Sequence, residues 1–178
     1  MSTHRRILLA AVSLLFATTV GVSLAETPHF GKPLDEAAIA SWDISILPDG
    51  TGLPKGSGTS AQGAAIFAEK CSACHGDNAK GGFAGALVGG GPIRGISASQ
   101  KTIKNFWGYS TTVFDFIRRA MPFTAPRSLS DDEVYALTAY ILAENKLIGA
   151  DETMNAETLP KVKMPNRDNF IIRFPDRI

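Results

Sequence analysis

The stretch CSACHG, Cys71 to Gly76, holds both cysteines of the chain and one of its three histidines within six residues. One helical turn separates Cys71 from Cys74, so both sulfurs face the same side, and the imidazole of His75 follows directly behind them. Two thiols at this spacing can form a structural disulfide, a redox dithiol, half of a zinc site or a covalent cofactor attachment. The rest of the chain decides between these chemistries.

Two of these interpretations require features that the sequence lacks. A thioredoxin-type dithiol belongs to a sheet-containing βαβ unit, which this glycine-broken helical chain does not offer. A structural zinc site needs four ligands, usually as two pairs, and the sequence contains no second pair of Cys or His. The pattern C-x-x-C-H is instead typical of c-type haem attachment, in which both thiols bond to the haem and the histidine binds iron. We therefore expect one covalent haem c on Cys71, Cys74 and His75.

The N-terminus predicts export. A basic start is followed by an almost purely apolar run, Ile7 to Val22, and by small residues ending at Ala25. These features predict a signal peptide over residues 1–25, cleaved after Ala25, and a periplasmic protein. An uncleaved membrane anchor is the alternative, because the run is only slightly shorter than the roughly 18 residues that span a bilayer. In an oxidising compartment two cysteines usually form a disulfide, so that interpretation stays open beside haem attachment.

Charge and length limit the other function classes. The 178 residues carry 18 basic and 17 acidic side chains, and cleavage would remove two basic residues, so 18 minus 2 leaves 16 and a net charge near −1. Such a balance gives no attraction for nucleic acid. The chain is long enough for one domain with extensions.

The expected organisation is an all-α domain between two irregular extensions. Residues 26–59 are rich in proline and glycine and predict an irregular arm, with one short helix over 35–42 and with Trp42 or Ile46 as its anchor. Residues 60–149 form the domain. Residues 150–178 are polar and predict a tail that wraps the domain without adding a core element, and no strand pattern is convincing.

Three helices are predicted within the domain. Ser60 can cap a helix that runs to Lys70. Apolar residues at helical spacing predict a helix over 111–120, which Pro122 ends. SDDE at residues 130–133 forms a capping box and begins a helix that runs to about Asn145. Residues 81–95 contain too much glycine for regular structure, and they lack the order of a phosphate-binding loop.

The iron of an electron carrier needs a second protein ligand, and Met with His raises the reduction potential. The candidates after cleavage are His29, Met121, Met154 and Met164. Met121 is the best of them, because it stands immediately before Pro122 in a loop between two predicted helices. We therefore predict His75 and Met121 as the iron ligands, while Met121 as a simple core residue is the alternative.

The segments SAQGAAIFAEKCSACHG, GPIRG, AMP and LTAYI together resemble a class I cytochrome c. The resemblance implies the class I cytochrome c fold, here with long irregular N- and C-terminal extensions. It implies that the first and last helices cross at Gly63, and that the carbonyl of Pro92 accepts a hydrogen bond from the second ring nitrogen of His75. The family positions are matched by Gly63, Phe67, Cys71, Cys74, His75, Pro92, Met121, Leu137 and Tyr140.

A narrower resemblance covers almost the whole mature chain. Segments such as SWDISILPDGTGLPKGSGT and LPKVKMPNRDNF are similar to monohaem cytochrome subunits or partners of bacterial molybdenum sulfite dehydrogenases and of sulfur dehydrogenase. The resemblance implies a periplasmic carrier that takes electrons singly from such an enzyme and passes them to a downstream cytochrome or oxidase. The alternatives are a permanent haem subunit of a dehydrogenase complex and a carrier for another periplasmic oxidoreductase. Some relatives carry two haems, whereas this chain has a single C-x-x-C-H.

The remaining candidates concern the haem propionates and the open iron site. Trp107 and Tyr109 supply an N–H and an O–H that could hold a propionate, and Arg118 could pair with one or meet an acidic partner. Core packing and a solvated helix face are the alternatives for these residues. An enzymatic role, in which Met121 leaves the iron, is the alternative to electron transfer, and binding of CO to the ferrous form would separate the two.

Overall fold

The computed structural model describes residues 30–40, 42–93 and 101–170, and the chain divides into a first unit, Met1–Ile39, and a second unit, Ala40–Ile178. The predicted signal peptide lies outside the described residues. Across those residues, no helix has both the length and the apolar character needed to cross a membrane. The short helix predicted in the arm is present as α2 (Glu36–Ala40), which has no buried residue.

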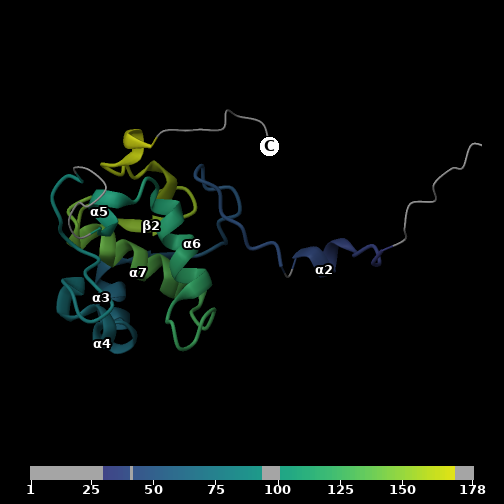
Figure 1. Ribbon diagram of the computed structural model, residues 1–178, viewed down its shortest axis with the longest axis horizontal. Helices are drawn as coiled ribbons and strands as arrows, with labels where there is room; N and C mark the ends of the chain where they lie inside the picture. The colour runs from purple at the N-terminus through teal and green to yellow at the C-terminus, as the bar shows by residue number, and fades with distance from the viewer. Residues whose placement is uncertain (1–29, 41, 94–100, 171–178) are drawn as a thin grey trace, which may run out of the picture. The chain divides into compact units, whose positions relative to one another are not determined.

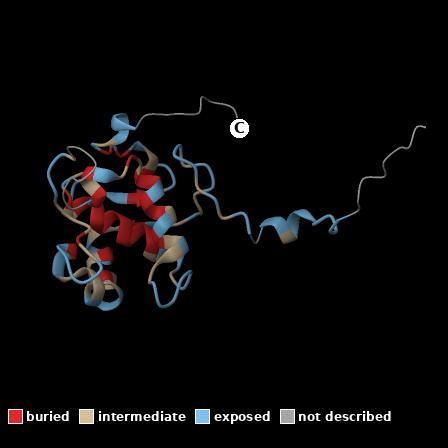
Figure 2. Cartoon of the chain, viewed as in Figure 1, coloured by how far each residue is buried: buried red, intermediate tan, exposed pale blue. Residues whose placement is uncertain are grey.

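The core of the second unit is built on α7 (Asp131–Glu144), which runs through its centre in Figure 1. All ten residues from 134 to 143 are buried, as the red ribbon in Figure 2 shows. The predicted capping box begins this helix, because Ser130 accepts from Glu133 N and the Glu133 carboxylate accepts from Ser130 N. A helix buried on every side must be covered by other segments all round.

The helix α3 (Ser60–Lys70) crosses α7 at Gly63, as predicted. A Cβ on Gly63 would meet the carbonyl of Ala136 and would lie 2.7 Å from Cβ of Tyr140, so only glycine allows this approach. The cap differs from the prediction by one residue. Thr59, not Ser60, accepts from Gln62 N, and the Gln62 side chain accepts from Thr59 N to complete a capping box.

Shorter elements surround this pair. The chain passes from α3 into α4 (Ser72–His75) and the 3₁₀ helix η1 (Asp77–Ala79), and later forms α5 (Ile103–Phe106). The predicted helix after residue 110 is α6 (Ser110–Ala120), which packs against α7. The sequence did not predict α4 or α5, because helices of four residues are too short to show a period.

A small antiparallel sheet joins the two extensions, where the sequence showed no convincing strand pattern, while the fold is otherwise helical as predicted. The strand β1 (Ser57–Thr59) pairs with β2 (Thr153–Asn155), with Gly58 opposite Met154. A Cβ on Gly58 would meet the backbone of Ala136, so the strand lies directly on α7. Strands of three residues carry too few alternating positions to be recognised in a sequence.

The C-terminal tail contributes to the core, so the expectation that it adds no core element is wrong. After β2 it forms the 3₁₀ helices η2 (Leu159–Lys161) and η3 (Arg167–Asn169). Its buried members of the core cluster are Met154, Leu159, Val162 and Met164.

In the N-terminal arm, Ile46 packs against the same core, whereas Trp42 is 81% exposed. Of the two residues predicted as anchors of the arm, Ile46 therefore takes that role and Trp42 does not.

Candidate haem site

The residues Cys71 to His75 form one tight turn at the end of α3. The carbonyl of Cys71 accepts from Cys74 N at 3.1 Å and from His75 N at 3.0 Å. Both thiols and the imidazole are half-buried. The turn therefore presents two sulfurs and a ring from a single rigid segment, as the C-x-x-C-H spacing predicted.

A glycine-rich loop packs back onto this turn. Gly76 leaves the turn at a φ of +73°, and a Cβ on Gly82 would meet the carbonyl of Cys74. The same carbonyl accepts from Ala84 N at 3.1 Å, and the carbonyl of His75 accepts from Gly81 N at 3.0 Å. The glycines thus let two stretches of backbone touch, which explains their number here better than a phosphate site does.

His75 is oriented by the next residues of this loop. Its Nδ1 lies 3.2 Å from the carbonyl oxygen of Gly85, and since a carbonyl can only accept, Nδ1 carries the proton. The Nε2 atom is then left with its lone pair for a metal. The prediction gave this role to Pro92, and it is corrected here: Gly85 holds the ring, and Pro92 is exposed.

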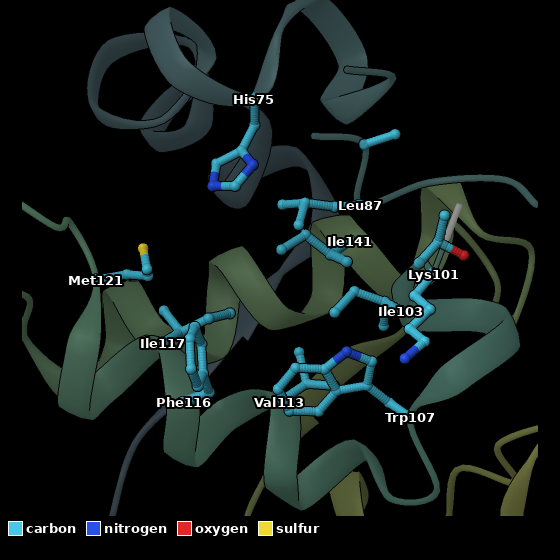
Figure 3. A pocket seen from close by; sticks show the side chains of 12 residues that line it. His75, Leu87, Lys101, Ile103, Trp107, Val113, Phe116, Ile117, Met121 and Ile141 are labelled. Atoms are coloured by element: carbon cyan, nitrogen blue, oxygen red, sulfur yellow. The ribbon is translucent and has the colours of Figure 1, made fainter. Parts of the chain in front are cut away.

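The imidazole points into an apolar pocket with a cavity volume of about 110 Å³. In Figure 3, His75 enters from the side of α4, while Met121 and Phe116 enter from α6 and its end. The pocket is partly open to solvent. Its lining residues are His75, Ala86, Leu87, Lys101, Thr102, Ile103, Trp107, Val113, Phe116, Ile117, Met121 and Ile141.

Met121 lines this pocket, and the other two described methionine candidates do not. It is the C-cap residue of α6, and its N–H donates to the carbonyl of Ile117 at 3.0 Å, which fixes its backbone. Met154 and Met164 lie in the core at 1% and 3% exposure. His29 lies outside the described residues. The structure therefore brings together His75 and Met121, from segments that are far apart in the sequence.

The other predicted site residues divide between the pocket and the surface. Trp107 lines the pocket and meets Phe116 edge to face, with ring centroids 5.5 Å apart. Tyr109 is turned toward Arg167, whose guanidinium lies 4.7 Å from its ring centroid. Arg118 pairs with Asp131 at 2.9 Å, in a separate small cavity. Of these three, the structure brings only Trp107 to the pocket.

Sequence reasoning missed two features of the site. Gly85 could not be recognised as the acceptor, because any backbone carbonyl in a glycine-rich loop can take that position. Among the described residues that line the pocket, Lys101 is the one lysine or arginine, and its ammonium lies 4.8 Å above the Phe106 ring. No motif marks it, since a single lysine before a short helix is usually a solvated residue.

The thiols differ from those of a redox dithiol. Burial raises the pKa of the Cys71 thiol to about 11, the neighbouring Cys74 adds to this, and Lys70 lowers it only in part. A thioredoxin-type nucleophile needs a lowered pKa, because the thiolate is the reactive form. The environment of Cys71 favours an uncharged sulfur, which is what a thioether bond also provides.

The residues present fit a haem c. An apolar cleft, an imidazole held at Nδ1 by a carbonyl, a thioether sulfur and two adjacent thiols are the donor set and surroundings that this group requires. Cys71 and Cys74 do not line the cleft themselves, but they stand within one turn of His75, which does.

Comparison with known proteins agrees with this geometry. The family model described as Cytochrome c matches residues 60–144. A chain of the crystal structure of the sulfane dehydrogenase SoxCD from Paracoccus pantotrophus is 39% identical, with a TM-score of 0.74 over 84% of this chain and 72% of that chain.

Two curated proteins match over shorter stretches. A thiosulfate dehydrogenase of Stutzerimonas stutzeri (strain A1501) is 33% identical over 92 residues, which are 49% of this chain and 28% of that protein. The Cbb3-type cytochrome c oxidase subunit FixP of Bradyrhizobium sp. (strain ORS 278) is 49% identical over 51 residues, which are 28% of this chain and 16% of that protein. The chain thus spans less than a third of either curated relative.

A helical domain that carries C-x-x-C-H beside an apolar pocket, with a methionine on the facing wall, defines a class I c-type cytochrome. The chain belongs to the cytochrome c family. Membership implies a covalently bound haem c and makes the chain an electron-transfer protein rather than a catalytic enzyme. Its relation to a chain of SoxCD links it to sulfur dehydrogenases.

Proposed function

We propose that this chain is a periplasmic cytochrome with one haem, which accepts electrons singly from a molybdenum sulfite or sulfur dehydrogenase and passes them to a downstream cytochrome or oxidase. The observation that carries the proposal is the placement of His75 and Met121 on one apolar pocket next to the turn that holds both cysteines. The likeness to a chain of SoxCD over 84% of the sequence supports a sulfur dehydrogenase as the electron donor.

Four side chains would hold the haem. Cys71 and Cys74 would form the two thioethers, and His75 and Met121 would ligate the iron. When bound, the group supplies an iron that gains and loses one electron. The chain's own residues keep the ligands fixed: the Gly85 carbonyl orients His75, and α6 fixes the backbone of Met121. The apolar lining supplies the low-polarity surroundings that the group would need.

The donor is tested by stopped-flow reduction of the oxidised holoprotein. Sulfite alone should reduce it slowly, and sulfite with a catalytic amount of a bacterial sulfite dehydrogenase should reduce it many times faster. A second arm replaces both with a sulfane-sulfur substrate and its dehydrogenase. If neither enzyme accelerates reduction, the donor assignment fails while the cytochrome assignment stands.

A permanent subunit of a dehydrogenase complex is the second candidate, favoured by the match to 72% of a chain of SoxCD. A free carrier separates from its enzyme during size-exclusion chromatography, because redox encounters bury small interfaces below about 1,200 Å². Co-elution of the two proteins at micromolar concentration would support the subunit.

Export is proposed from the N-terminal pattern and has its own test. If the signal is cleaved after Ala25, the mature protein begins at Glu26, and peptide mass analysis of the periplasmic fraction should find that end. A protein that starts at Met1 and sediments with membranes would support the uncleaved anchor. The intact mass should exceed that of the polypeptide by one haem.

A further inference from the structure

The wall of the pocket opposite α6 is a glycine loop held by buried polar side chains. Within this loop Ala86 and Leu87 line the pocket, and Gly85 carries the carbonyl that meets His75. We propose that Asn145 is a positioning residue for His75: its amide fixes the loop so that the Gly85 carbonyl stays in place beneath Nδ1. The inference rests on the proposed role of His75 as an iron ligand.

Asn145 uses its whole amide to tie the loop to α7. It is only 2% exposed. Its Nδ2 donates to the Leu87 carbonyl at 3.2 Å and to the Ile141 carbonyl at 2.9 Å, and its Oδ1 accepts from Gly89 N at 3.1 Å. A buried amide with both hydrogens and its oxygen engaged has one stable orientation. The side chain therefore joins two points of the loop to the end of the helix that forms the core.

Other groups hold the same short segment at its backbone, without tying it to α7. The hydroxyl of Thr102 donates to the Gly89 carbonyl at 2.6 Å. The carbonyl of Ala79 accepts from Leu87 N at 2.9 Å and from Val88 N at 3.1 Å. These bonds act on the backbone of residues 87–89, and Asn145 is the group that connects this backbone to α7.

Gly85 itself has little else to fix it. Its φ is +82°, and a Cβ built on it would meet nothing within 4 Å. On its N-terminal side, its N–H donates to the carbonyl of Gly82 at 3.0 Å. On its C-terminal side, its position depends on Ala86 and Leu87, and thus on the bonds from Asn145. Without that amide the Gly85 carbonyl would gain freedom to turn away from His75.

The hydrogen bond from His75 to Gly85 affects two measurable quantities, the midpoint potential of the iron and the rate at which the Nδ1 proton exchanges with solvent. A ligand histidine that donates its second N–H to a carbonyl is oriented by it and becomes more basic. A more basic ligand stabilises the oxidised iron, so a weaker bond should raise the midpoint potential. The Nδ1 proton should also exchange faster with solvent when its acceptor is mobile.

The experiment compares Asn145→Ala with Thr138→Val in the holoprotein. Thr138 lies on the same helix, is fully buried, and donates only to its own helix at Val134, so it is a matched control away from the loop. Exchange of the His75 Nδ1 proton is followed by NMR in the ferrous state with ¹⁵N-labelled histidine. The midpoint potential is measured by redox titration.

Asn145→Ala should accelerate this exchange about tenfold or more and should raise the midpoint potential, because loss of the hydrogen-bond partner of a ligand histidine typically changes affinity or activity by about 10–100-fold. A tenfold change in the redox equilibrium corresponds to about 59 mV. Thr138→Val should leave both quantities unchanged. If Asn145→Ala does not accumulate with haem, Asn145→Ser is the variant to measure, because it keeps a small polar side chain in the same place.

Unchanged exchange and potential in the Asn145 variant that retains haem would overturn the inference. Equal changes in the Thr138→Val protein would also overturn it, because general loosening of the core would then explain the effect. Failure of the wild-type protein to show a haem-ligated His75 is a different result, and it would overturn the proposed function.

Discussion

Met121 differs from the other described methionines in what its side chain does. Met154 and Met164 fill the core, whereas Met121 is half-buried and faces the pocket. A half-buried side chain at a helix end adds little to packing. Its contribution is therefore expected at the iron and not in the stability of the polypeptide.

Met121→Ala should leave a folded protein whose iron has lost one ligand. The methionine–iron absorption band should vanish, the ferrous form should bind CO, and the midpoint potential should fall, because a methionine ligand raises it. Met154→Ala is the control. It should lose about 2–5 kcal/mol of stability to urea while keeping the band and resisting CO. Retention of the band in Met121→Ala would remove this residue from the iron.

Tyr135 links α7 to the arm through its hydroxyl, which donates to the Pro54 carbonyl at 2.9 Å. Burial raises the pKa of Tyr135 from its usual 10 to about 12, and the nearby Asp131 adds to this. Because the pKa of Tyr135 is higher in the folded state than in the unfolded chain, its hydroxyl contributes fully to the stability of the fold below pH 10. It is lost as the pH rises from about 10 to 12, where the unfolded chain ionises first.

Tyr135→Phe should therefore cost about 1 kcal/mol at pH 8, the usual net value of a hydrogen bond. The difference in stability between wild type and variant should shrink between pH 10 and pH 12. Urea unfolding at pH 8, 10 and 11 measures it. A difference that stays constant up to pH 11 would show that the hydroxyl does not titrate as described.

For single residues, the sequence could predict the side chains that bind a haem but not the backbone groups that hold those side chains. Cys71, Cys74 and His75 form a local motif, and Met121 could be chosen because few side chains can ligate iron. The acceptor for His75 is a carbonyl, which every residue possesses, so the choice of Pro92 over Gly85 had no physical basis in the sequence. Its position depends on how the glycine loop folds.

The element that determines the fold is the crossing of α3 and α7, and Gly63 makes it possible. Ala is favoured over Gly in a helix by about 1 kcal/mol, so Gly63→Ala would stabilise an isolated helix. In this protein the added Cβ would meet the Ala136 carbonyl and the Tyr140 side chain. Packing and helix propensity therefore predict opposite signs.

Gly63→Ala should destabilise the protein by about 1–3 kcal/mol, the usual cost of overpacking. Ala65→Gly, at an exposed position of the same helix, is the control, and it should cost about 1 kcal/mol through propensity alone. Urea unfolding of both variants decides the matter. A Gly63→Ala protein that is more stable than wild type would mean that the two helices can move apart at no cost.

Long periodic elements were predictable and short ones were not. The helices α3, α6 and α7 have eleven to fourteen residues, enough for apolar spacing and caps to show. The strands β1 and β2 have three residues each, and they form because the backbone at Gly58 can lie on α7. Such a pairing depends on a surface that exists only after the helices have packed.

Across the whole molecule, the two extensions differ in what they contribute. The tail after α7 buries apolar side chains in the core cluster, and β2 pairs it with β1. The region around Trp42 and Leu47 leaves large apolar side chains exposed. The sequence predicted both extensions as irregular because both are rich in proline, but composition does not report which apolar residues find a partner.

This difference gives a paired prediction for two single substitutions. Leu159 is fully buried in the core cluster, and Trp42 is 81% exposed. Leu159→Ala should cost about 2–5 kcal/mol through lost burial and an unfilled cavity. Trp42→Ala, which removes the larger side chain, should change stability by no more than about 0.5 kcal/mol. Urea unfolding of the two holoproteins should give this order. If Leu159→Ala lost no more stability than Trp42→Ala, the tail would lie on the surface without contributing to the core, as its polar composition predicts. The domain would then end near residue 149.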